Sequence, residues 1–60
     1  MPARFEVYKD ASGQLRFRLR AANNEIIAVS EAYTTKAACL NGIESVKTNA
    51  PVAEIEDQTE

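Results

Sequence analysis

Histidine and tryptophan are absent from this chain of 60 residues, and cysteine occurs once, as Cys39. Without histidine, the chain lacks the most frequent general base of enzymes and the Cys-His and Ser-His pairs of nucleophilic catalysis. One cysteine cannot close an internal disulfide bond, and without histidine it cannot complete a zinc site. We therefore predict that the protein is not an enzyme and that it holds no metal or cofactor.

Glycine is scarce as well. Only Gly13 and Gly42 occur, and this excludes a glycine-rich loop for phosphate binding. No apolar run approaches the roughly 20 residues that a membrane-spanning helix requires. The first residues, Met1-Pro2-Ala3-Arg4, lack the apolar stretch of a signal peptide. We expect a cytoplasmic protein that does not enter a membrane, and a lone thiol is consistent with a reducing compartment.

The short chain limits how much surface the protein can bury. Its 60 residues allow one domain, 1–60, which buries only about 60% of the surface that the unfolded chain exposes. Because disulfide bonds and zinc are excluded, self-association is the remaining means of stabilisation. The net charge of −2, from 9 acidic and 7 basic side chains, gives no overall attraction to nucleic acid or to anionic membranes. These observations predict a homodimer.

Three segments in the first half of the chain have the composition and periodicity of β-strands: residues 5–8, 14–21 and 26–30. The second alternates most regularly, with Leu15, Phe17 and Leu19 on one face. Gly13 and Asn24 stand in the intervening turns, where both residue types tolerate a positive φ. The three segments therefore predict an antiparallel meander.

Residues 35–49 have the periodicity of an amphipathic helix. At about 100° per residue, Cys39, Ile43 and Val46 lie on one narrow apolar stripe, which is typical of a helix packed on a flat surface. Thr35 is a suitable N-cap, and Pro51 marks the end of the helix. We expect this helix to lie on one face of the meander.

Several residues on or near this stripe allow both a functional and a structural interpretation. Cys39 lies at its centre, which favours a buried, inert thiol over a nucleophile, because no histidine accompanies it. Gly42 costs about 1 kcal/mol relative to alanine within a helix, and we interpret it as room for close packing against the sheet or a ring such as Phe17. We interpret Tyr8 and Tyr33 as rings at the edge of the core rather than as ligand contacts.

The C-terminal segment 51–57 predicts a fourth strand, and Gln58 to Glu60 are expected to be frayed. The order is then β-β-β-α-β, an α+β fold in which one helix packs on an antiparallel meander and leaves the other sheet face uncovered. A short strand at a sheet edge is readily exchanged between two copies, which is a low-cost route to a dimer. The candidate exchange segment consists of Val52, Ala53, Glu54, Ile55 and Glu56.

Three arginines occupy one face of the second predicted strand: Arg16, Arg18 and Arg20. Guanidinium groups about 7 Å apart along a strand could follow a phosphate backbone or another polyanion. Pairing with Glu6, Glu54 or Glu56 across neighbouring strands explains the same pattern. The net negative charge of the chain favours this second interpretation over nucleic-acid binding.

Six segments have a combination of residues that matches a known pattern: FEVYKD (5–10), FRLRAAN (17–23), EIIA (25–28), SEAY (30–33), KAAC (36–39) and NGIESVK (41–47). In these segments the chain resembles the YegP-like family of short, uncharacterised bacterial domains. The resemblance extends from about residue 5 to residue 49. It implies a β3-α-β unit, found singly or in tandem, that pairs into one continuous sheet with exchanged C-terminal strands. A single-repeat chain would then be a homodimer, and the resemblance implies no activity.

The sequence thus favours one function and leaves a second function as an alternative. The first is a small, non-enzymatic, homodimeric interaction or accessory module whose target is unknown. The alternative is weak binding of nucleic acid or another anion through Arg16, Arg18 and Arg20.

Overall fold

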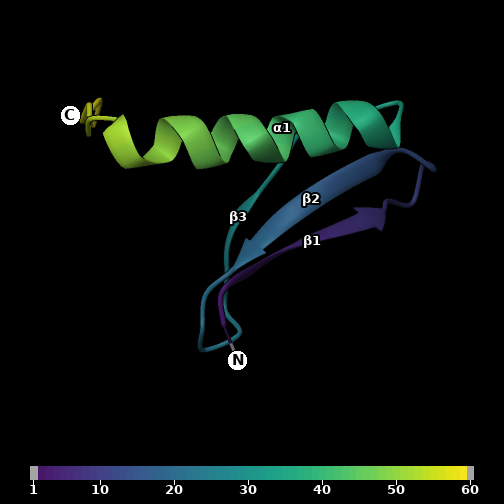
Figure 1. The fold of residues 1–60 in the computed structure, drawn as a ribbon, viewed down its shortest axis with the longest axis horizontal. Helices are drawn as coiled ribbons and strands as arrows, with labels where there is room; N and C mark the ends of the chain where they lie inside the picture. Colours follow the sequence, from purple (N-terminus) through teal and green to yellow (C-terminus); the bar gives the residue numbers. More distant parts are fainter. Residues whose placement is uncertain (1, 60) are drawn as a thin grey trace.

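Three strands and one helix form the fold, as the alternating and helical patterns predicted. The computed structural model describes residues 2–59. It contains β1 (Arg4–Lys9), β2 (Leu15–Arg20), β3 (Ile26–Val29), α1 (Lys36–Asn49) and a short 3₁₀ helix, η1 (Ala50–Val52). The strands form one antiparallel sheet in the order β1-β2-β3, and α1 lies across one face of it (Figure 1). The α+β prediction is confirmed.

The two hairpin turns have the backbone conformations that their residues favour. Gly13 has φ +87° and Asn24 has φ +74°, the left-handed region that both residue types tolerate. In the first turn the Asp10 carboxylate accepts hydrogen bonds from the backbone N–H groups of Ser12 and Gln14, each at 2.9 Å. These local bonds determine the length of the hairpin and therefore the register in which β1 and β2 pair.

Helix α1 begins at the predicted cap and holds the most deeply buried residues. The Thr35 hydroxyl accepts a hydrogen bond from the Ala38 N–H at 3.1 Å, which satisfies one of the free amides of the first turn. Cys39 and Ile43 on the helix pack against Phe17 of β2, and all three are buried. The core of the protein is therefore a single contact between α1 and the middle strand.

This contact covers only part of the sheet. Seen from the side, the strands slope away from the helix, and the C-terminal end of α1 extends beyond them (Figure 1). Val46 is accordingly only half-buried, and Ala50 is exposed. The predicted apolar stripe is thus buried at its centre and uncovered toward its C-terminal end.

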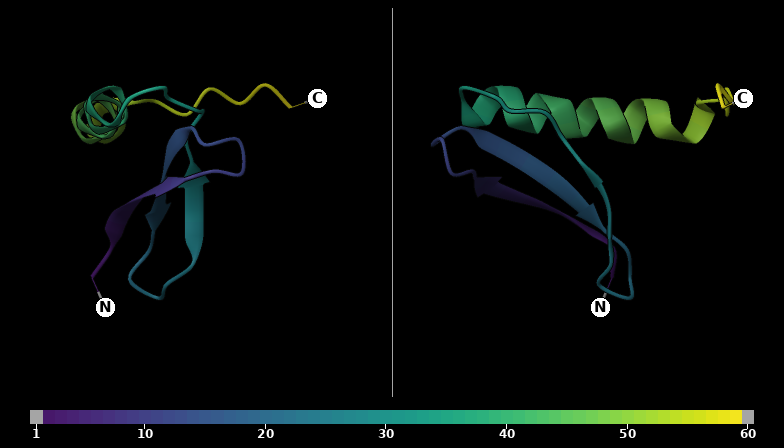
Figure 2. Two further views of the ribbon diagram at one scale, coloured as in Figure 1. Left: turned by 90° about the vertical axis from the view of Figure 1, so that its right-hand side faces the viewer. Right: turned by 180° about the vertical axis from the view of Figure 1, so that it is seen from behind.

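The predicted fourth strand over 51–57 is not formed within the single chain, and its exchange between two copies stays a prediction. Residues 50–52 form η1, and residues 53–59 follow in no regular element. A strand needs a neighbouring edge for its backbone N–H and C=O groups. The chain leaves α1 beyond the end of its own sheet and runs crosswise to the helix there (Figure 2). Gln58 and Thr59 are exposed, and Glu60 lies outside the described residues.

Gly42 has a specific reason to be a glycine. A β-carbon at this position would lie 2.9 Å from Cζ of Tyr33 and 3.1 Å from Cε2 of Phe17, and the Tyr33 hydroxyl is nearer still. The two rings are stacked, with centroids 6.3 Å apart. Tyr33 is anchored by its backbone, which exchanges hydrogen bonds of 2.8 and 2.7 Å with Leu15. The prediction of a ring against Gly42 is confirmed, although Tyr33 lies closer than Phe17.

We expect Gly42→Ala to destabilise the protein by about 1–3 kcal/mol, because the added methyl group would force Tyr33 or the helix to move. This loss opposes the gain of about 1 kcal/mol that alanine brings to a helix interior. Urea unfolding followed by circular dichroism measures the difference. Asn41→Ala on the exposed side of the same turn is the matched control and should leave stability unchanged or slightly raised. A Gly42→Ala variant as stable as the control would contradict this account.

Candidate interaction surfaces

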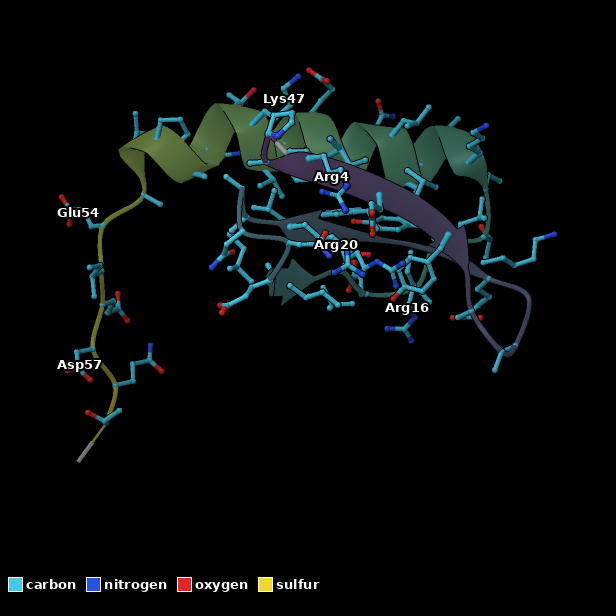
Figure 3. The ribbon with its side chains drawn as sticks, turned by 90° about the horizontal axis from the view of Figure 1, so that it is seen from below. Arg4, Arg16, Arg20, Lys47, Glu54 and Asp57 are labelled. Atoms are coloured by element: carbon cyan, nitrogen blue, oxygen red, sulfur yellow. The ribbon has the colours of Figure 1, made fainter. Side chains whose placement is uncertain are left out.

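The sheet face opposite α1 has four arginines, which we call the arginine face: Arg4, Arg16, Arg18 and Arg20. Because side chains alternate along a strand, Phe17 points into the core while its neighbours Arg16 and Arg18 point away from the helix. Figure 3 views the molecule from this side and shows Arg4, Arg16 and Arg20 together on the sheet.

Glu6 of β1 holds three of these arginines together. Its carboxylate accepts hydrogen bonds from Nε of Arg18 at 2.6 Å, Arg20 at 2.7 Å and Arg4 at 3.0 Å. In the register of the sheet, Glu6 lies opposite Arg18. The hydrogen bonds from Arg18 and Arg20, with that from Arg4, lower the pKa of Glu6 from 4.5 to about 2. Glu6 therefore stays ionised well into the acidic range.

Asp10 at the end of the first hairpin holds the fourth arginine. Its Oδ2 accepts a hydrogen bond from Arg16 Nε at 2.9 Å, while Oδ1 caps the turn. The Arg16 guanidinium, followed by the Ser12 side chain, holds the pKa of Asp10 well below its usual range. Nη1 of Arg16 donates a hydrogen bond to the backbone carbonyl of Ser30, just after β3, at 3.2 Å. Arg16 thus spans the sheet from the hairpin to the end of the edge strand.

The arginine face has more positive than negative groups. Four guanidinium groups meet two carboxylates, Glu6 and Asp10, which leaves an excess of 4 − 2 = 2 positive charges. The interpretation of Tyr8 as a ring at the edge of the core is wrong: it lies on this face, with the Arg18 guanidinium 4.6 Å from the centre of its ring, because it alternates with Val7 along β1. The predicted pairing with Glu6 is confirmed. Glu54 is far from the sheet in Figure 3, so the predicted pairing with the tail carboxylates does not occur within one chain.

The opposite face of the sheet contains a cavity of about 390 Å³ under the C-terminal half of α1. The rings of Phe5, Phe17 and Tyr33 line it together with Leu19 of β2 and Val46 of α1. Residues of β3, of the segment after it and of α1, where Gly42 and Ser45 lie, complete the lining. Packed interiors rarely leave voids larger than a water molecule, so this space is the part of the apolar face that the single helix does not cover.

Next to this cavity lies an edge strand without charge. Ile26, Ile27 and Val29 of β3 are 49–60% exposed, and no strand in residues 2–59 pairs with the outer edge of β3. The tail beyond α1 is exposed as well, with Val52 at 77% and Ile55 at 97%. The described chain therefore leaves two apolar elements uncovered, one at the sheet edge and one in the tail.

The remaining candidate groups have structural surroundings. Cys39 is fully buried, as predicted, between α1 and the sheet. Within residues 2–59, no three His, Cys, Asp or Glu side chains lie close enough together to hold a metal ion. No helix in the described part of the chain is both long and apolar enough to cross a membrane.

Comparison with known proteins places this arrangement in a family. Residues 10–57 match the model of a domain of unknown function, DUF1508. The chain belongs to the DUF1508 family. A UPF0339 protein of Treponema denticola is 60% identical over 55 residues, which covers 92% of this chain and 95% of that protein. The predicted resemblance to short, uncharacterised bacterial domains is confirmed, and the family description assigns no activity.

Two further DUF1508 comparisons concern fold and length. The solution structure of a protein from Haloferax volcanii superposes with a TM-score of 0.86 at 44% identity, covering 93% of this chain and 95% of that one. A UPF0339 protein of Stutzerimonas stutzeri is 55% identical over 51 residues, which make up 85% of this chain but only 46% of that protein. The family therefore includes proteins about twice as long as the matched stretch.

The sequence indicated most of the arginine face but not all of it. Arg16, Arg18 and Arg20 lie together as their alternation predicted, and Arg4 joins them from β1. Asp10 was missed as a partner of Arg16. Asp10 stands in a turn that contains Ser and Gly, and an Asp in such a turn commonly accepts hydrogen bonds from the backbone with one carboxylate oxygen. The other oxygen is then free to pair with an arginine, which is the signal that could have identified Asp10. The cavity could not be predicted from the sequence. Its lining comes from every strand and from the helix, so no local pattern marks it.

Glu6 predicts a specific pH dependence of stability. Its pKa is lower in the folded state than in the unfolded state, so its contribution is complete above about pH 4.5 and is lost as the pH falls toward 2. Urea unfolding of the natural protein and of Glu6→Gln should differ at pH 6 and differ much less at pH 3. Glu44→Gln, which removes an exposed ion pair to Lys47, is the control and should change stability little at either pH. An equal difference at the two pH values would contradict the role of Glu6.

Proposed function

We propose that this protein is a small, non-enzymatic interaction module that works as a homodimer, in which residues 52–56 of each copy add to the β3 edge of the other. The observation that carries the proposal is the pair of uncovered elements. Within residues 2–59, the tail has alternating apolar residues and no strand partner, and β3 has an apolar edge with which no strand pairs. Each supplies what the other lacks.

The choice of edge follows from charge. β1, at the other edge of the sheet, includes Arg4, Glu6 and Lys9, and charged side chains on an edge strand oppose pairing with another chain. β3 consists of Ile26–Val29 and has no charged residue. An edge strand of this kind is a favourable template for an added strand. We therefore assign the exchanged segment to β3.

Length and composition support the same arrangement. A chain of 60 residues without disulfide bonds or metal ligands needs further buried surface, and a second copy provides it. Relatives such as that of Stutzerimonas stutzeri are about twice as long, and two repeats in one chain would supply the same contacts covalently. The free, buried thiol suits a reducing cytoplasm. Neither surface combines a nucleophile with a base, which is why the proposal is not an enzyme.

Sedimentation at micromolar concentration should show a dimer, and replacing Glu54 and Ile55 together by proline should shift it to monomer. Successive N–H groups of a strand point to opposite edges, so two adjacent prolines remove one N–H that faces the partner strand. Both residues are exposed, so the monomer should stay folded. The same double replacement at Gln58 and Thr59, outside the exchange segment, is the matched control and should remain dimeric. A natural chain that is folded and monomeric would rule out the dimer, and a dimeric Glu54→Pro/Ile55→Pro variant would rule out the exchange.

A second candidate function is binding of nucleic acid or another polyanion by the arginine face. The observation in its favour is the excess of two positive charges there. Titration of labelled single- and double-stranded oligonucleotides at low and moderate salt tests it. Binding should weaken with salt and be lost when Arg16, Arg18 and Arg20 are replaced by alanine. Binding that is absent, or unchanged in the triple variant, eliminates this candidate.

A further inference from the structure

The exchange segment has two different faces when it is extended. Side chains alternate along a strand, so Ala53 and Ile55 project to one side and Val52, Glu54 and Glu56 to the other. One side is therefore wholly apolar and the other mainly acidic. The sheet beside which it would lie also has two faces, the apolar one with the cavity and the arginine face.

The β3 edge continues both faces of the sheet. Ala28 pairs with Leu19, which lines the cavity, while Val29 pairs with Arg18 on the arginine face. Directly opposite residues of an antiparallel pair share a face. A strand added to β3 therefore presents one set of its side chains to the cavity side and the other to the arginine side. Only one of the two orientations avoids placing unpaired carboxylates against an apolar cavity.

We infer that the second copy completes both faces of the sheet, an inference that rests on the proposed exchange. Ile55 of the second copy enters the cavity under α1, and its Glu54 and Glu56 pair with the arginine face. The two carboxylates bring −2 to a face that has an excess of +2. By two-fold symmetry each copy gives one tail and receives one. The cavity and the arginine face are each incomplete without the partner.

Arg16 is the arginine best placed to meet these carboxylates. Its side chain is 37% exposed, more than those of the other three arginines, and one of its amino groups lies 3.2 Å from the carbonyl of Ser30, next to the end of β3. Neighbouring strands are about 4.8 Å apart, so a strand beside β3 is within reach of a guanidinium that already extends across it. Arg18 and Arg20, by contrast, are directed toward Glu6 on β1.

Nuclear Overhauser effects between chains test the apolar half of the inference. In a dimer refolded from equal amounts of ¹³C-labelled and unlabelled chains, the Ile55 methyl groups of one copy should contact the Phe17 ring of the other. Ile55→Ala should also raise the dissociation constant of the dimer at least about 100-fold, since each dimer would lose two buried side chains. Gln58→Ala is the control and should change it little. A dimer without this ring contact overturns the inference.

A double-mutant cycle tests the charged half. At low salt, replacing Glu54 and Glu56 by glutamine should raise the dissociation constant roughly tenfold, and the effect should disappear at high salt. In an Arg16→Gln background the same replacements should have a much smaller effect, because their partner has been removed. An equal effect in both backgrounds, or none in either, overturns the pairing with Arg16.

These outcomes separate the inference from the proposed function. If sedimentation shows only monomer, the dimer itself fails. If the Glu54→Pro/Ile55→Pro variant is monomeric but Ile55→Ala does not weaken the dimer, the exchange stands, and the assignment of Ile55 to the cavity is wrong.

Discussion

Packing of α1 on the middle strand of the sheet is the contact on which the rest of this structure depends. Phe17, Cys39 and Ile43 are the hydrophobic residues buried at this contact, and the half-buried rings and aliphatic side chains pack around them. Gly42 lets the helix approach closely enough for Tyr33 and Phe17 to stack beneath it. The helix is therefore held over one end of the sheet, with its first turns close to β2 and its last turns beyond the strands.

This placement determines what remains uncovered. One helix cannot cover a three-stranded sheet, so the cavity remains under the far half of α1, and β3 keeps an exposed apolar edge. The same overhang carries the tail away from its own sheet, where it has no edge to pair with. The cavity, the open edge and the unpaired tail thus have one common cause, and the exchange that we propose would cover all three.

The other face of the sheet is held together by charged groups rather than by apolar packing. Four arginines are organised by two carboxylates, and Glu6 alone accepts from three of them. Charge-assisted hydrogen bonds of this kind fix the side chains in place and strengthen the pairing of β1 with β2. Because positive groups remain in excess, the face is also suited to an acidic partner, and we propose the acidic residues of a second copy's tail for this role.

The amino-acid sequence by itself determined the strands, the two turns and the helix, because each depends on a local pattern. Alternation placed Phe17 opposite Arg16 and Arg18, Gly13 and Asn24 allowed the positive φ of the turns, and Thr35 began the helix. Only the tertiary structure decided that Asp10 meets Arg16, that Tyr33 lies against Gly42 and that residues 53–59 form no strand within one chain. These features depend on the register of the sheet and on the position of the helix above it. Both arise from contacts between residues far apart in the chain, which no local pattern encodes.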